Sequence, residues 1–105
     1  MVRVAKKLAF KSDHEHFKHS ALVLKGGNII SSAYNKGVKH AEQFALEKLP
    51  PEARKGCTVI SIRVTKGGKL AMAKPCRKCE AYMREHGVHA VEWSDEFEVM
   101  HRERL

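Results

Sequence analysis

Four residues in the middle of the chain have the types and spacing of a metal centre that performs chemistry. His40 is followed two positions later by Glu42, and Cys76 and Cys79 form a Cys-x-x-Cys pair directly after Pro75. Catalytic zinc sites use three protein ligands and keep one position open, whereas structural sites usually fill all four positions with protein. One histidine and two cysteines therefore predict a zinc ion with an open position for water or substrate.

The chemistry expected of such a centre is hydrolysis. Zinc lowers the pKa of its water toward neutrality and so provides a hydroxide nucleophile. Glu42 has a side chain suited to moving protons, from the water to a ring nitrogen of the substrate and then to departing ammonia. The alternative is a carboxylate that only stabilises a helix start through the helix dipole. The accompanying cysteine pair favours the catalytic role.

Helix geometry predicts where the zinc lies. Residues two apart on a helix point about 200° away from each other, so His40 and Glu42 cannot both face a metal on a helix flank. We therefore expect His40 in or before the first turn of one helix. Cys76 and Cys79 are three apart and share one face of the first turn of another. At two helix N-termini, unpaired amides and helix dipoles would stabilise thiolate and hydroxide.

The hydrophobic pattern predicts an α/β fold that carries these motifs. Apolar residues at helical spacing indicate three helices, at residues 2–10, 40–49 and 77–86. β-Branched and apolar runs indicate four strands, at residues 21–24, 28–33, 57–64 and 88–93. The first two strands form a hairpin around Gly26-Gly27, and the last two are parallel because a helix crosses between them. The result is a mixed sheet with helices on both faces.

A histidine-rich segment precedes the hairpin. His14, His16 and His19 fall within six residues, which raises the possibility of a second metal site. No cysteine accompanies these histidines, and a polar loop needs no partner for them, so we expect a loop. If this loop lies near the zinc, Lys18 and the histidines would meet a substrate phosphate.

Size and composition bound the class of protein. The chain has 105 residues, which predicts a single domain over residues 1–105. Its 20 Lys and Arg against 12 Asp and Glu give a formal charge of +8, which favours an anionic partner such as a nucleotide phosphate or a nucleic acid. The alternative is a basic surface without a specific partner.

The same sequence predicts a cytoplasmic protein. No apolar run is long enough to span a membrane, and the first four residues contain no signal-peptide core. In a reducing compartment, Cys-x-x-Cys favours metal binding over a disulfide. The third cysteine, Cys57, begins an apolar run and is expected to be an inert buried thiol.

With both motifs in view, the sequence resembles the cytidine deaminase superfamily, which includes deoxycytidylate deaminases and tRNA adenosine deaminases. The resemblance covers most of the chain. It is carried by the glycine-turn hairpin, by Asn35, by His40-Ala41-Glu42 and by Pro75-Cys76-Arg77-Lys78-Cys79. It implies three zinc ligands, His40, Cys76 and Cys79, with Glu42 as proton shuttle. It also implies Asn35 as a hydrogen-bond partner of the sugar or base, although Tyr-Asn-Lys-Gly is equally good turn chemistry.

The resemblance also implies a fold and an assembly. The family fold is a three-layer α/β/α sandwich around a five-stranded sheet, and here we expect a mixed sheet of four or five strands. A fifth strand would have to come from the charged tail, around Phe97 to Met100, or be missing. Small deaminases of this kind often complete their pockets from neighbouring subunits, which predicts a homo-oligomer.

The substrate is open among three classes. We favour cytosine in a nucleoside or nucleotide, such as cytidine, deoxycytidine or dCMP, converted to the uracil product and ammonia. The alternatives are cytosine or adenine in single-stranded DNA or RNA, and a non-catalytic zinc-stabilised module that binds nucleic acid. Proteins that bind single-stranded nucleic acid stack its bases on aromatic side chains, and aromatic residues make up only 7% of this chain. Candidate substrate contacts beside Asn35 are Ala41, Pro75, Trp93 and Ser94, with core packing as the alternative for Trp93.

Overall fold

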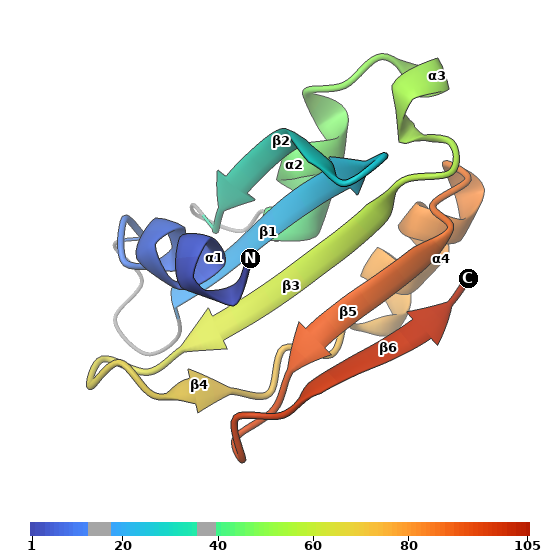
Figure 1. Ribbon diagram of the computed structural model, residues 1–105. Helices are drawn as coiled ribbons and strands as arrows, with labels where there is room; N and C mark the ends of the chain where they lie inside the picture. The colour runs from blue at the N-terminus through green and yellow to red at the C-terminus, as the bar shows by residue number, and fades with distance from the viewer. Residues whose placement is uncertain (13–17, 36–39) are drawn as a thin grey trace.

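A mixed β-sheet forms the centre of the computed structural model, which describes residues 1–12, 18–35 and 40–105 (Figure 1). Its strands are β1 (Lys18–Lys25), β2 (Asn28–Tyr34), β3 (Thr58–Val64), β4 (Leu70–Ala71), β5 (Ala90–Ser94) and β6 (Met100–Arg104). They follow the order β2-β1-β3-β5-β6, with β4 paired to β3. β3 and β5 are parallel, as predicted, and the other pairs are antiparallel.

The β1–β2 hairpin turns at two glycines in the left-handed region. Gly26 and Gly27 have φ angles of 60° and 81°, which a residue without a Cβ adopts at no steric cost. The turn brings Lys25 opposite Asn28 and, at the far end, Ser20 opposite Tyr34. β1 therefore begins earlier than the predicted residue 21.

Helices cover both faces of the sheet, which confirms the predicted three-layer α/β/α arrangement (Figure 1). α1 (Val2–Ala9) packs on one face against the apolar side of β3, where Ile60, Ile62 and Val64 point together as predicted. α2 (Ala41–Glu47) and α4 (Arg77–Glu85) lie on the other face. The core there includes residues from both helices and from β1, β3 and β5, such as Ala45, Met83 and Val59.

A short helix not expected from the sequence follows α2. α3 (Pro51–Arg54) begins at Pro51, after Pro50 as its N-cap. Proline is compatible with the first helical position because its missing N–H would have no intrahelical partner there. The proline pair therefore ends α2 and also starts α3.

The sheet is larger than expected, because β4 adds a short sixth strand. The tail supplies the fifth strand, β6, but the predicted position of that strand was wrong. β6 spans Met100–Arg104 rather than the segment around Phe97. Phe97 is 77% exposed and Val99 is 50% exposed, so neither side chain anchors the tail to the core. Charged residues dominate β6. Edge strands commonly carry charged side chains, because these prevent the exposed edge from pairing with other chains.

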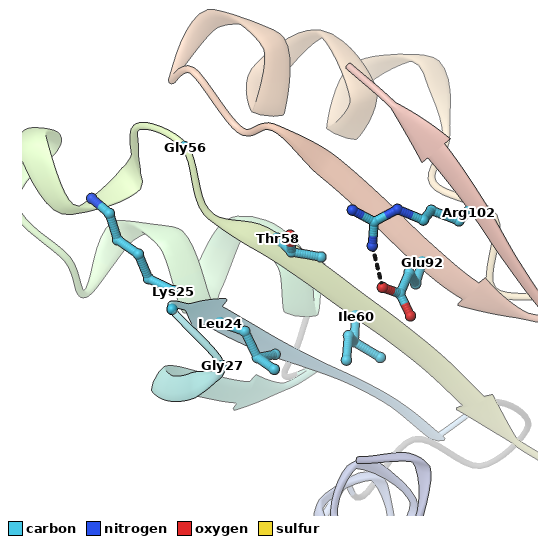
Figure 2. A pocket seen from close by; sticks show the side chains of 9 residues that line it. Leu24, Lys25, Gly27, Gly56, Thr58, Ile60, Glu92 and Arg102 are labelled. Carbon is cyan, nitrogen blue, oxygen red and sulfur yellow. Dashed lines mark hydrogen bonds and ion pairs between the residues drawn. The ribbon is translucent and has the colours of Figure 1, made fainter.

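One end of the α1 face is not covered by that helix. A shallow pocket of about 210 Å³ lies there, over the strands and beyond α1 (Figure 2). Arg102 of β6 pairs with Glu92 of β5 at 2.6 Å across its floor.

None of the helices in the described ranges is long and apolar enough to cross a membrane.

Candidate active site

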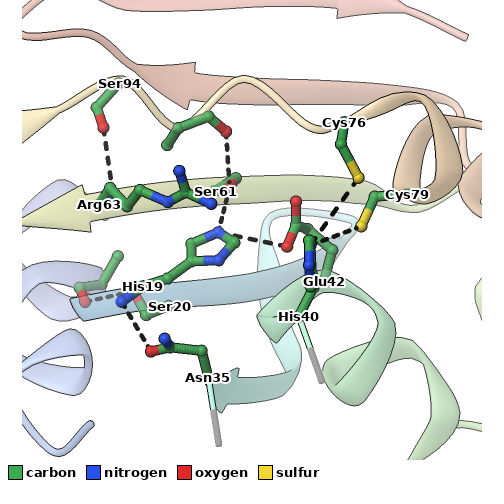
Figure 3. Close-up of polar contacts among 12 residues, drawn as sticks. His19, Ser20, Asn35, His40, Glu42, Ser61, Arg63, Cys76, Cys79 and Ser94 are labelled. Atoms are coloured by element: carbon green, nitrogen blue, oxygen red, sulfur yellow. Dashed lines mark hydrogen bonds and ion pairs between the residues drawn. The ribbon is translucent and has the colours of Figure 1, made fainter. Parts of the chain in front are cut away.

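Three side chains that could hold a metal meet at the N-termini of α2 and α4 (Figure 3). His40 is the N-cap of α2, Cys76 is the N-cap of α4, and Cys79 lies in the first turn of α4. His40 Nδ1 is 3.2 Å from Cys79 Sγ and 4.0 Å from Cys76 Sγ. The three ligand atoms all lie within 4.8 Å of one another, as the two motifs predicted for a site between helix ends.

This cluster fits zinc. Tetrahedral zinc takes sulfur at about 2.3 Å and nitrogen at about 2.0–2.1 Å, which puts such ligand atoms roughly 3.6 Å apart. The two measured nitrogen–sulfur distances, 3.2 and 4.0 Å, bracket that value. Borderline-soft nitrogen and thiolate donors are also the set that zinc prefers.

The Cys79 thiol supplies an electrostatic reason for a cation here. Burial, the Glu42 carboxylate and Cys76 raise the pKa of Cys79, so a metal-free site holds a thiol rather than a thiolate. A bound cation reverses this balance, since a coordinating thiol is deprotonated by the metal. The buried carboxylate and two sulfurs therefore form a site that a divalent cation neutralises.

Glu42 lies beside the cluster, in the first turn of α2, with its side chain turned inward. The residue is 1% exposed, and its carboxylate lies between the His19 ring and the three ligands (Figure 3). Burial raises its pKa to about 7, and Arg63 partly offsets that effect. Among the described residues, its Oε1 has no hydrogen-bond partner. A carboxylate that served only the helix dipole need not be fully buried, because full burial disfavours its charged form.

His19 is a site residue that the sequence did not reveal. The structure places it in β1, 3% exposed, and not in the predicted loop. Its Nε2 lies 2.7 Å from Ser61 Oγ and 3.3 Å from Glu42 Oε1. Burial lowers the His19 pKa to about 3, with Arg63 and His40 adding to the effect, so the ring is neutral.

A signal for His19 does exist in the sequence. His19, Ala21 and Val23 alternate with residues that face α1, so extending the strand backward by two positions turns His19 toward the site. The other two histidines of that cluster, His14 and His16, lie outside the described residues. The second metal site considered there is therefore untested.

Asn35 lies next to His19 at the end of β2. Its Oδ1 accepts the His19 backbone N–H at 3.0 Å, and its own N–H donates to the His19 carbonyl at 2.9 Å. The Ser12 hydroxyl donates to its carbonyl at 3.1 Å. These bonds fix the side chain beside the site, and a substrate contact by Asn35 stays a prediction.

The remaining candidate substrate contacts differ in their surroundings. Ala41 is fully buried at the start of α2, and Pro75 is half-buried next to the ligand Cys76. Trp93 is 8% exposed and stacks on His101 with ring centroids 5.6 Å apart. Ser94 donates to the Ala71 carbonyl and accepts the Arg63 backbone N–H. These contacts of Trp93 and Ser94 are thus with the core and with neighbouring strands.

A pocket opens at the metal-ligating cluster. It has a volume of about 370 Å³ and is lined by His40, Gln43, Cys76, Lys78, Cys79 and Tyr82. Lys78 places a cation at the rim of this pocket.

Cys57 lies outside the pocket and is fully buried, as expected. Burial raises the pKa of Cys57, which fits an inert thiol.

Comparison with known proteins gives one family. Residues 1–94 match the family described as the cytidine and deoxycytidylate deaminase zinc-binding region. No curated protein matches the chain significantly.

Solved structures agree in fold. The apo dCMP deaminase of cyanophage S-TIM5 superposes with a TM-score of 0.68 at 21% identity, over 90% of this chain and 79% of that one. Two forms of RibD from Acinetobacter baumannii give TM-scores of 0.62 and 0.61 at 16% and 17% identity. The match covers 90% of this chain but only 26% of RibD. At these identities the likeness is one of fold.

Proposed function

The chain belongs to the cytidine and deoxycytidylate deaminase family of zinc-binding type, and we propose that it hydrolyses the exocyclic amine of cytosine in a nucleoside or nucleotide. The products are the corresponding uracil compound and ammonia. The observation that carries the proposal is Glu42, a buried carboxyl group beside His40, Cys76 and Cys79 whose pKa is raised to about 7. A purely structural zinc site has no use for such a group.

Each residue has a defined role in the reaction. When bound by His40, Cys76 and Cys79, zinc supplies the Lewis acidity that brings the pKa of a water toward neutrality. Glu42 would accept a proton from the attacking water and deliver it to the ring nitrogen N3 as the water oxygen bonds to C4. It would then move the remaining proton of that oxygen to the amino group, so that the C4–N bond breaks, ammonia leaves and the C4 carbonyl of the uracil product forms. A carboxyl group with a pKa near 7 suits both the accepting and the donating steps at neutral pH.

Substrate binding would use residues near the metal-ligating cluster. We assign Asn35 to the sugar or base and Ala41 and Pro75 to the walls near the reacting ring. We assign Trp93 and Ser94, at the end of β5, to further substrate contacts. The Lys74 ammonium group lies over the Trp93 ring, with Nζ 5.6 Å from the ring centroid. Lys78 at the pocket rim would attract a phosphate. A homo-oligomer that completes the pocket is part of the same proposal.

Ammonia release by the zinc-loaded protein tests the function against a panel. The panel holds cytidine, deoxycytidine, their monophosphates, adenosine, and single-stranded DNA and RNA. The proposal predicts turnover of a free cytosine compound, with the monophosphate preferred. Turnover of polymers alone would make the +8 charge a backbone-binding surface and replace the proposal with nucleic-acid deamination. A protein that binds zinc and nucleic acid without releasing ammonia would be a binding module.

A further inference from the structure

We infer that His19 is the positioning residue of Glu42: its neutral imidazole, oriented by the Ser61 hydroxyl, shares its one Nε2–H between Ser61 Oγ and Glu42 Oε1. The inference deepens the proposed function and rests on it for the role of Glu42. It gives a task to a buried histidine that belongs to neither motif. The three side chains come from β1, β3 and α2, and they meet behind the metal-ligating cluster (Figure 3).

The tautomer of His19 follows from the contacts of Ser61. The Ser61 hydroxyl donates its one proton to the Ala73 carbonyl at 3.1 Å. Its oxygen therefore acts as the acceptor toward His19 Nε2, 2.7 Å away. We therefore assign the ring proton to Nε2 and leave Nδ1 as the bare nitrogen, since the Ala73 carbonyl can only accept the Ser61 proton.

The Nε2–H is directed at Ser61 Oγ, and Glu42 Oε1 lies to one side of it, close enough to share the proton. Glu42 Oε1 lies 3.3 Å from His19 Nε2, and no hydrogen-bond partner among the described residues satisfies this oxygen. A buried acceptor without a partner is costly, so the neighbouring ring N–H is of use to it. Catalytic hydrogen bonds are often long before substrate binds and shorten in the reactive complex. One carboxylate oxygen is thus held on the His19 side, and the other is left for proton transfer.

The backbone around His19 keeps the ring in place. β1 is paired on both sides, with β2 and with β3, where His19 lies opposite Arg63. Asn35 accepts the His19 N–H through Oδ1 and donates to its carbonyl, so both backbone groups are bound by one residue. Catalytic side chains need supports of this kind, on rigid strands, to hold productive geometry. A histidine that only filled the core would need a partner for its ring N–H, which Ser61 supplies, but would not need the Glu42 contact.

Nitrogen-15 NMR of histidine-labelled protein tests the tautomer without requiring activity. The His19 signals are identified by their absence in His19→Gln among those of the seven histidines. We expect a protonated Nε2, an unprotonated Nδ1, and a downfield Nε2–H proton that moves upfield in Glu42→Gln. An Nδ1–H tautomer, or a proton that does not respond to Glu42→Gln, would overturn the inference.

Kinetics of two matched variants separate positioning from packing. His19→Leu removes the donor and keeps bulk, whereas His19→Gln keeps an N–H donor near the position of Nε2. We expect His19→Leu to lower kcat by about 10- to 100-fold, the usual loss for supporting groups, with KM changed less than about twofold. His19→Gln should recover most of that loss, and zinc content should stay at the unmodified level in both.

The controls make each outcome decisive. His89 is exposed on the loop before β5, and His89→Leu and His89→Gln should match the unmodified protein. Equal losses in His19→Leu and His19→Gln, with zinc retained, would assign His19 to packing and overturn the inference. If the unmodified protein turns over no substrate, the proposed function fails, while the NMR experiment still decides the contact between His19 and Glu42.

Discussion

Cys79 Sγ lies 3.2 Å from His40 Nδ1, although 39 residues separate the two in sequence. The contact exists because α2 and α4 begin side by side on one face of the sheet (Figure 3). α2 packs on β1 and β2, and α4 leads into β5, which is parallel to β3. The site therefore depends on the sheet order more than on either motif alone.

Removing the buried cysteine should remove zinc and its stabilisation. Ligand binding to the native state raises stability by about 3–4 kcal/mol at 100 to 1,000 times Kd. We predict that a chelator lowers the Tm of the unmodified protein but not that of Cys79→Ala, measured by calorimetry with parallel metal analysis. Cys57→Ala is the control, since it changes another buried thiol outside the cluster. Equal zinc content in Cys79→Ala and the unmodified protein would contradict the ligand assignment.

Glu42→Gln should separate metal binding from catalysis. The amide keeps the shape of the side chain but cannot accept a proton, so we expect kcat to fall by at least about 100-fold. Zinc content should not fall, because Glu42 is not among the three ligands. Ammonia release and metal analysis on the same sample check both points. Loss of zinc together with activity would place Glu42 in the coordination sphere.

In the metal-free protein, the Glu42 carboxyl group should make the free energy of unfolding fall as the pH rises, and Glu42→Gln should remove that fall. Burial raises the Glu42 pKa from 4.5 to about 7, so the native state binds the proton more tightly than the unfolded chain. This contribution is full below pH 4.5 and is lost as the pH rises to about 7. At about 1.4 kcal/mol per pKa unit, the loss is roughly 3 kcal/mol. Glu42→Gln should lack this decline in urea unfolding from pH 4.5 to 7.5, and an unchanged profile would contradict it.

His19 predicts the opposite pH dependence in acid. Its folded-state pKa is about 3 against 6.5 for the free side chain, so the unfolded chain binds the proton more tightly. Its contribution is complete above pH 6.5 and is lost as the pH falls toward 3. His19→Gln should therefore be less sensitive to acid than the unmodified protein in urea unfolding from pH 6.5 to 4. Identical acid profiles would mean that His19 can take up its proton in the native state.

The tail gives a prediction about stability alone. Phe97 is 77% exposed, so Phe97→Ser should change the free energy of unfolding by less than about 0.5 kcal/mol. Trp93 is 8% exposed and packs in the core, so Trp93→Ala should cost about 3–5 kcal/mol. Urea unfolding of both variants checks the comparison. A large loss of unfolding free energy in Phe97→Ser would contradict the exposed position of Phe97 in the turn before β6.

The metal-ligating cluster was predictable because its information is local. A histidine in front of one helix and Cys-x-x-Cys at the start of another fix where each ligand stands on its own helix. That the two helix ends meet follows from the hairpin and the parallel crossover, both readable from apolar runs and glycines. The helices on both faces and the parallel β3–β5 pair were therefore predicted correctly.

Two features were missed because their cause is not local. His19 stands among other histidines in a polar stretch, which hides its alternation with Ala21 and Val23, and its pairing with Arg63 and Asn35 fixes it in the strand. Charged residues outnumber apolar ones in β6, so its hydrophobic pattern is weak, and backbone pairing with β5 determines where it begins. Phe97 misled the prediction because its apolar side chain lies in an exposed turn.

The most direct test of the central claim is product analysis in heavy-oxygen water with the zinc-loaded protein and a cytosine nucleotide. The account predicts one heavy oxygen in the uracil product and one ammonia per product, with both lost in Glu42→Gln at equal zinc content. Bound zinc with no ammonia from any cytosine compound, or product formed without heavy oxygen, would contradict it.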